Sequence, residues 1–220
     1  MMWPAKRVRS MKQTIAALIG LVLGASAFAQ GTINFANAVN AQIRAPIYGP
    51  NPSNPTESLS GNTTDGIPPG TTVYPGSLLE GSGYTAGLFV IGGSSDPVAT
   101  ADFGTGANAG FWWPTVAAVP GARAGTSVQV QVRVWDNRGV TITQWAEVLA
   151  DDTVARGSSS ILTVGPLGGI DPGGNQFLPA LLNGLESFNL HTVPEPTIGM
   201  LAGLGLLLGG CALRRRQSGS

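Results

Sequence analysis

Residues able to do nucleophilic or acid–base chemistry are scarce in this 220-residue chain. It has one histidine, His191, and one cysteine, Cys211, which lies in a hydrophobic segment near the C-terminus. A nucleophilic triad needs a histidine base, and zinc sites need His and Cys ligands. Because His191 stands beside the C-terminal tail, neither arrangement is expected in the body of the chain. We predict no catalytic residue and no enzymatic activity.

Carboxylates leave one catalytic alternative open. Glycoside hydrolysis needs two acidic side chains held about 5 to 9.5 Å apart. Eleven Asp and Glu lie between residues 30 and 192, and folding could pair some of them. The candidates are Glu80, Asp136, Glu147 and Glu186. A carboxylate-dependent glycoside hydrolase therefore remains a second alternative function.

Two acidic turns carry the oxygen donors that Ca²⁺ prefers. Asp151 and Asp152 are adjacent, and Asp171 precedes Asn175 with two glycines between them. Neither turn has the spacing of an EF-hand loop. We interpret both as solvated turns and expect no metal site and no cofactor.

The tryptophans are candidates for ligand binding. Trp112 and Trp113 are adjacent, and Trp135 falls on the predicted outward face of a strand. Exposed indole rings at these three positions could stack on sugars and form a carbohydrate-binding module, the first alternative function. Tryptophan is highly buried on average, so core packing is the competing interpretation.

The clearest structural element is a strand over residues 127–135. Four valines alternate there with polar or aromatic residues, a period of two that buries one face. Residues 136–139 have turn chemistry, and we expect 140–142 to begin a returning strand. Residues 144–150 fit either a short helix or a further strand.

Short apolar runs between turn residues favour an all-β fold. Further strands are expected at 32–35, 84–91, 161–164 and 187–190, with a long surface loop at 49–83 and a second Gly/Pro-rich stretch at 165–174. We predict one antiparallel β-sandwich domain over residues 30–192, Ig-like or jelly-roll in style.

The charge of the chain is unevenly distributed. Seven of its twelve Lys and Arg lie at the two ends, which leaves five arginines and no lysine between residues 30 and 192. With eleven acidic residues, this body has a formal charge of −6. An acidic surface does not neutralise phosphates, so a nucleic-acid partner is not expected.

The N-terminus has the pattern of a secretory signal peptide. A basic segment over residues 6–12 precedes an apolar run over 15–25, and Ala27-Phe28-Ala29 is a small-x-small cleavage site. We predict a signal over residues 1–29, removed by signal peptidase before Gln30. Met11 followed by Lys12 would also begin a complete signal, so translation from residue 11 is an alternative start.

The C-terminus pairs a hydrophobic segment with a cluster of positive charge. The apolar run 197–213 is 17 residues long, so as a helix it reaches about 25 Å, close to the ~30 Å core of a bilayer. Arg214, Arg215 and Arg216 follow it. Each charge costs ~2.5 to 3.5 kcal/mol at the membrane centre, so they stay on the side of synthesis. We predict a transmembrane helix over 197–213.

The tail as a whole, residues 193–220, resembles the PEP-CTERM sorting class of exported bacterial proteins. Pro194, Glu195 and Pro196 are followed by the glycine-rich apolar run and the arginine cluster. In that class an exosortase recognises and processes the tail in the membrane, usually in bacteria that make exopolysaccharide. The resemblance implies Pro194 to Pro196 as the recognition motif and Arg214 to Arg216 as the membrane stop. An ordinary tail anchor fits the hydropathy equally.

The sequence therefore predicts an exported structural protein that is associated with the cell surface or the extracellular matrix. It would be anchored in the membrane at least transiently and then reside on the surface or outside the cell. Expected partners are signal peptidase, an exosortase-type enzyme and the membrane, with exopolysaccharide as a candidate ligand.

Overall fold

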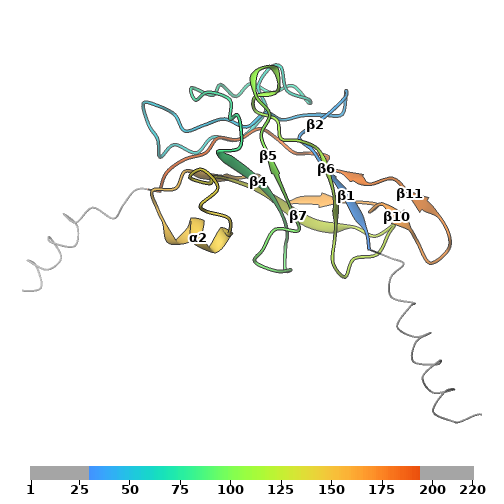
Figure 1. Ribbon diagram of the computed structural model, residues 1–220. Helices are drawn as coiled ribbons and strands as arrows, with labels where there is room; N and C mark the ends of the chain where they lie inside the picture. Colours follow the sequence, from blue (N-terminus) through green and yellow to red (C-terminus); the bar gives the residue numbers. More distant parts are fainter. Residues whose placement is uncertain (1–29, 194–220) are drawn as a thin grey trace, which may run out of the picture.

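The computed structural model describes residues 30–193, and these form a β-rich body (Figure 1). The predicted signal peptide and the predicted transmembrane helix lie outside the described residues. Within residues 30–193 no helix is long and apolar enough to span a bilayer.

The all-β prediction is confirmed. The strands are β1 Thr32–Phe35, β2 Ala38–Val39, β3 Ile43–Arg44, β4 Tyr84–Val90, β5 Ala99–Asp102, β6 Thr115–Ala118, β7 Val128–Asp136, β8 Arg156–Ser158, β9 Leu162–Val164, β10 Gly169–Ile170, β11 Gln176–Phe177 and β12 Ala180–Leu181; the helices are the 3-10 turn η2 Gly106–Asn108 and α2 Trp145–Ala150.

The larger sheet is built around β7, the strand predicted from its alternating valines. Its order is β5-β4-β7-β8, with β9 also pairing with β7. All these pairings are antiparallel, and the longest runs from Tyr84 opposite Asp136 to Val90 opposite Val130. Strand β7 begins one residue later and ends one residue later than predicted. The predictions of strands near 84–91 and 161–164 are confirmed as β4 and β9.

The smaller sheet corrects one part of the predicted architecture. Strand β1 coincides with the predicted strand 32–35 and pairs with β6 antiparallel. Its other neighbour, β12, runs parallel to it, with Ile33 opposite Ala180 and Asn34 opposite Leu181. A purely antiparallel arrangement was therefore wrong, because a strand from the end of the body inserts beside the first strand.

Two short antiparallel pairs, β2–β3 and β10–β11, stand apart from these sheets. The five-stranded and the three-stranded sheet share one hydrophobic core. Val130, Val132 and Val134 of β7 point into it and are completely buried, and so are Ile33 and Phe35 of β1. Apolar side chains from β3, β4, β6, β9 and β12 and from the segments between strands belong to the same cluster. The period of two in β7 thus identified the core face correctly.

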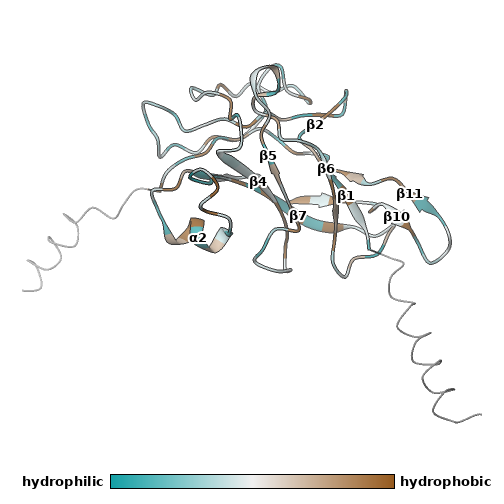
Figure 2. Cartoon of the chain, in the orientation of Figure 1, coloured by the Kyte–Doolittle hydropathy of each residue, from teal (hydrophilic) through white to brown (hydrophobic). Residues whose placement is uncertain are grey.

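The opposite face of β7 is also covered, by a second and smaller core. Trp135 packs there with Phe89, Val148 and Val154. Val148 belongs to α2, which resolves the alternative left open for residues 144–150 in favour of a helix. The helix carries both hydrophobic and hydrophilic residues (Figure 2), as expected for a segment that covers a core on one side.

The predicted returning strand at 140–142 is not formed. Arg138, Gly139 and Val140 all have positive φ, at 51°, 69° and 71°, and the chain turns instead of extending. The Asn137 side-chain oxygen accepts a hydrogen bond from the Val140 N–H, and its backbone oxygen accepts from Thr141. A positive φ is rare for a β-branched residue, so these bonds hold Val140 in a conformation that its own preferences oppose.

No strand forms between β3 and β4, in agreement with the loop predicted for 49–83. The loop is nevertheless tied into the body. The Tyr74 hydroxyl donates to the carbonyls of Gly61 or Ser187 at 2.7 Å, and Tyr74 stacks on Tyr48. Asn62 is buried and accepts a hydrogen bond from the Ser187 N–H.

Two further expectations need correction. Residues 187–190 are buried, but they form only isolated bridges, such as Asn189 with Tyr48, since the irregular loop and not a regular strand lies beside them. The Gly/Pro-rich stretch 165–174 contains β10, which pairs with β11 in a short hairpin across the turn at Asp171.

Candidate functional site

The three candidate tryptophans have different surroundings. Trp135 is completely buried in the second core, so its predicted role as a glycan contact is wrong. It does lie on the face of β7 opposite the valines, but α2 covers that face. Trp112 is 3% exposed, whereas Trp113 is 59% exposed. Of the three, Trp113 alone offers an open ring surface.

Trp113 lies at a surface pocket of about 210 Å³. Three segments distant in sequence form it: the β2–β3 ribbon, the turn around η2 and the aromatic run that precedes β6. The lining is mostly apolar, with two polar side chains. Its residues are Ala38, Arg44, Gly104, Ala107, Asn108, Phe111, Trp112, Trp113 and Pro114.

Asn37 holds the floor of this pocket in place. It is completely buried, and its Nδ2 atom donates to the carbonyls of Ala45 and Gly110 at 2.9 Å each. Its Oδ1 atom accepts from the Trp112 N–H at 3.2 Å. The Trp112 indole N–H also donates to the Phe35 carbonyl at 3.1 Å. A buried amide with partners on both sides fixes the two chain segments against each other.

Arg44 and Asn108 supply the polar groups of the pocket. The Arg44 guanidinium lies 5.0 Å from the centroid of the Phe111 ring, within the range of a cation–π contact. Among residues 30–193 the recorded ion pairs are those of Arg138 and Arg156, and Arg44 has none. Arg44 is one of only five arginines in an acidic body, which could have marked it as a candidate for ligand binding. Nothing in the sequence predicted its contact with Phe111.

Three of the four candidate carboxylates have hydrogen-bond or ion-pair partners of their own. Asp136 forms an ion pair with Arg138, at 3.7 Å between Oδ2 and Nε. Glu147 accepts hydrogen bonds from the N–H groups of Thr143 and Gln144 and caps α2. The other two, Glu80 and Glu186, are exposed, and Glu80 accepts a 3.3 Å hydrogen bond from the Gly106 N–H.

Both acidic turns use their carboxylates internally. Hydrogen bonds from the Thr153 side chain and backbone lower the pKa of Asp151, and those from Asn175 lower the pKa of Asp171. Within the described part of the chain no group of three or more His, Cys, Asp or Glu residues is arranged to hold a metal ion.

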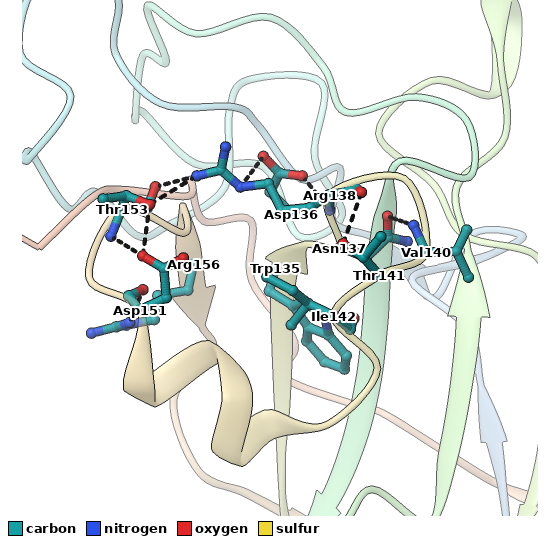
Figure 3. A network of polar contacts seen from close by, with 10 residues as sticks. All are labelled: Trp135, Asp136, Asn137, Arg138, Val140, Thr141, Ile142, Asp151, Thr153 and Arg156. Atoms are coloured by element: carbon teal, nitrogen blue, oxygen red, sulfur yellow. Dashed lines mark hydrogen bonds and ion pairs between the residues drawn. The ribbon is translucent and has the colours of Figure 1, made fainter.

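A polar network joins the turn after β7 to the segment after α2 (Figure 3). Asp136 contacts Arg138, whose Nη2 atom donates to the Thr153 carbonyl at 2.8 Å. The Asp151 carboxylate accepts from the Thr153 hydroxyl at 2.6 Å. The network therefore links the turn after β7, which leads to Ile142, with the segment that follows α2.

The described body ends in ordered backbone pairing. His191 and Arg156 exchange backbone hydrogen bonds of 2.9 and 3.0 Å, and the Thr192 N–H donates to the Pro55 carbonyl at 2.9 Å. The described chain ends on the side of α2 and begins at β1 on the opposite side of the body (Figure 1). Burial, and secondarily the nearby Arg156, lower the pKa of His191.

The sorting residues lie outside the described part of the chain. These are Pro194, Glu195, Pro196 and Arg214 to Arg216, together with Ala27 and Ala29 of the predicted signal cleavage site. Gln30, the residue after that site, is the first one described and is exposed.

Comparison with known proteins bears on the tail. No curated protein and no solved structure matches the chain. A family model, the PEP-CTERM protein-sorting motif, matches residues 192–217. The match starts at Thr192, the residue whose N–H donates to Pro55 at the end of the folded body. The chain therefore carries a PEP-CTERM protein-sorting motif at its C-terminus.

Proposed function

We propose that the chain is an exported protein which an exosortase-type enzyme processes and delivers to the cell surface or the extracellular matrix. The observation that carries the proposal is the sorting motif over residues 192–217. Export begins with signal peptidase cleavage before Gln30. The segment 197–213 then holds the chain in the membrane until the enzyme acts at Pro194 to Pro196, with Arg214 to Arg216 as the stop.

The position of the motif directly after the folded body is consistent with processing by such an enzyme. Among residues 30–193, Thr192 is the last whose backbone N–H donates a hydrogen bond, and Pro194 follows two positions later. Two prolines around Glu195 disfavour helix and central strand, as expected for a motif that a processing enzyme has to reach. The proposed division is a signal over 1–29, one β-sandwich domain of Ig-like or jelly-roll style over 30–192, and a sorting tail over 193–220.

We further propose that the displayed body has no catalytic activity and acts as a structural component. Asp136 and Glu147 are engaged in an ion pair and a helix cap, and the lining of the aromatic pocket contains no Asp, Glu or His. Incubation of the purified chain with polysaccharides should release no new reducing ends. Release that is lost in Glu147→Gln or Asp136→Asn would instead favour the hydrolase alternative.

Intact-mass measurement of the protein from cells and from medium tests the sorting proposal. The expected mature species begins at Gln30 and lacks the segment after Pro196, with any additional mass marking a transferred group. Substitution of Glu195→Ala should leave the full tail in the membrane fraction. Ser218→Ala, which lies beyond the arginines, is the matched control and should be processed normally.

Two results would contradict the proposal. A mature protein with an unshortened C-terminus in the membrane would identify an ordinary tail anchor. Normal shortening of the Glu195→Ala variant would show that the processing enzyme does not read the motif.

A further inference from the structure

We propose that the pocket beside Trp113 binds a uronic acid residue of a polysaccharide. The proposal concerns the folded body and does not depend on how the chain is sorted. It starts from three side chains that the fold brings to one place: the exposed indole of Trp113, the guanidinium of Arg44 and the carboxamide of Asn108. We refer to these three, with Phe111, as the open cluster.

The size and the lining of the pocket fit one sugar ring. Its volume of about 210 Å³ is below the ~300 to 1,000 Å³ typical of sites for drug-sized ligands. Trp113 is 59% exposed, although an indole gains free energy from burial. A pyranose presents an apolar C–H face to such a ring and hydroxyls around its edge. The exposed ring is therefore matched by the chemistry of a sugar.

The Arg44 guanidinium favours an acidic sugar over a neutral one. Its guanidinium rests on Phe111 and has no ion pair among residues 30–193. The planar fork of a guanidinium matches a carboxylate with two parallel hydrogen bonds. A neutral sugar would leave this charge unmatched, whereas a uronic acid carries a carboxylate directly on the ring that stacks. Asn108, exposed and without a recorded side-chain hydrogen bond within the described residues, can donate to and accept from the ring hydroxyls.

The backbone that carries the cluster is fixed by hydrogen bonds to neighbouring segments. Arg44 lies in β3, and its backbone exchanges hydrogen bonds with Ile67 at 3.0 and 3.2 Å. The Trp113 N–H donates to the Asp102 carbonyl at 3.0 Å. Gly104 has no room for a side chain, since a Cβ atom there would lie 2.6 Å from the Asn108 Cβ. Preorganised groups lose little entropy on binding.

The charge of the rest of the body makes the proposal specific. Residues 30–192 have a net charge of −6, so the body as a whole repels an acidic polysaccharide. Any attraction must come from a local site. Arg123, which is also exposed, lines a separate pocket without aromatic residues, and it therefore provides a charge-matched control.

Calorimetric titration of the purified full-length chain in detergent tests the proposal. The probes are the trimers of galacturonate, glucuronate and mannuronate, together with methyl-esterified trigalacturonate, which keeps the ring but lacks the charge. We expect one uronate trimer or more to bind at one site per chain, more weakly as salt is added. The methyl ester of a bound galacturonate trimer should bind roughly tenfold more weakly or not at all.

Variants connect binding to the open cluster. Trp113→Ala and Arg44→Gln should each weaken binding roughly tenfold or more, and Arg44→Lys should restore only part of the loss because it keeps the charge without the fork. The matched controls, Leu178→Ala for an exposed apolar residue and Arg123→Gln for an exposed charge, should bind like the parent chain. Circular dichroism should be the same for all of them.

Three results would overturn the proposal: no binding of any of the three uronate trimers, equal binding of acid and methyl ester, or binding unaffected by Trp113→Ala and Arg44→Gln. Failure here leaves the sorting proposal intact, since that one is measured by the mass of the mature protein. Failure of sorting likewise leaves this titration interpretable.

Discussion

The folded body has two clusters in which an arginine contacts aromatic side chains. We call them the covered cluster, which α2 packs against, and the open cluster, which is defined above. In the covered cluster Arg133 lies 4.3 Å from the centroid of the Phe89 ring and 5.1 Å from that of Trp145, and Trp135 lies beneath. In the open cluster Arg44 lies 5.0 Å from the Phe111 ring. The side-chain chemistry is nearly the same, but α2 and its flanking turns lie over the first cluster and nothing in the described chain encloses the second.

The covered cluster has internal partners for its polar groups. The Trp135 indole N–H donates to the Ile142 carbonyl at 3.2 Å, and the Arg133 Nε–H donates to Gln131 at 2.9 Å. Arg44 and Asn108 of the open cluster have no such partners among residues 30–193. Polar groups that are satisfied internally stabilise a fold, whereas polar groups left at an open aromatic surface are suited to a ligand.

The largest expected contrast is between the two tryptophans. Trp135→Ala should lower the free energy of unfolding by about 3 to 5 kcal/mol, because it leaves a cavity beneath α2. Trp113→Ala should change it by only about 0.5 kcal/mol, since its ring is largely in solvent. Urea unfolding followed by far-ultraviolet circular dichroism measures both. Similar losses in the two variants would remove the distinction between the clusters.

Asn37 tests whether the open cluster depends on its own scaffold. Asn37→Ala removes three hydrogen bonds from a fully buried site and leaves their partners unsatisfied. We expect a loss of about 2 to 3 kcal/mol in unfolding free energy, together with weaker uronate binding. Asn108→Ala should weaken binding without loss of stability, so equal stability losses in the two variants would contradict the assignment.

The two arginines should separate stability from binding. Arg133→Gln removes contacts to two aromatic rings and should cost about 1 kcal/mol of unfolding free energy. Arg44→Gln loses one contact, to Phe111 at 5.0 Å on an exposed side chain, so it should lower the unfolding midpoint in urea less than Arg133→Gln does while it weakens uronate binding. A stability loss in Arg44→Gln as large as that in Arg133→Gln would identify the open cluster as structural too.

The smallest effect on the covered cluster is expected from pH, through His191. The pKa of His191 is lowered below its ordinary value of 6.5, first by burial and then by Arg156. The unfolded chain therefore takes up a proton at higher pH than the folded chain. The stability that this group contributes is complete above about pH 6.5 and is lost as the pH falls through the folded pKa.

Arg156 links this titration to α2, because its guanidinium donates to the Val148 carbonyl at 2.6 Å and pairs with Asp152. Acidification should thus loosen the covered cluster first, visible as a change in Trp135 and Trp145 fluorescence. His191→Gln should reduce this pH dependence. An unchanged profile in that variant would assign it to the carboxylates instead.

Local patterns predicted a good part of this structure. The alternation over 127–135 gave the buried valine face and nearly the bounds of β7, because side-chain direction in a strand repeats every two residues. The same alternation placed Trp135 on the other face but could not show that α2 covers that face. The prediction of a returning strand at 140–142 was wrong because the Asn137 side chain bonds to the Val140 N–H, in a turn whose residues 138–140 have positive φ.

The candidate site was predicted only in part. Adjacent tryptophans marked residues 112 and 113, but their exposures of 3% and 59% depend on the packing of distant segments. Arg44 reaches Phe111 because Asn37 bonds to Gly110 and Trp112, more than 70 positions away along the chain. Contacts of that separation leave no periodicity in a single sequence.

The sequence by itself determined three features: the sorting motif, the acidic body between basic ends, and the central strand β7. Each is a property of residues that are neighbours along the chain. The tertiary structure alone decided which tryptophan is buried, which arginine is covered and where β12 inserts beside β1. Those outcomes depend on which distant surfaces meet, and burial is a property of the assembled fold.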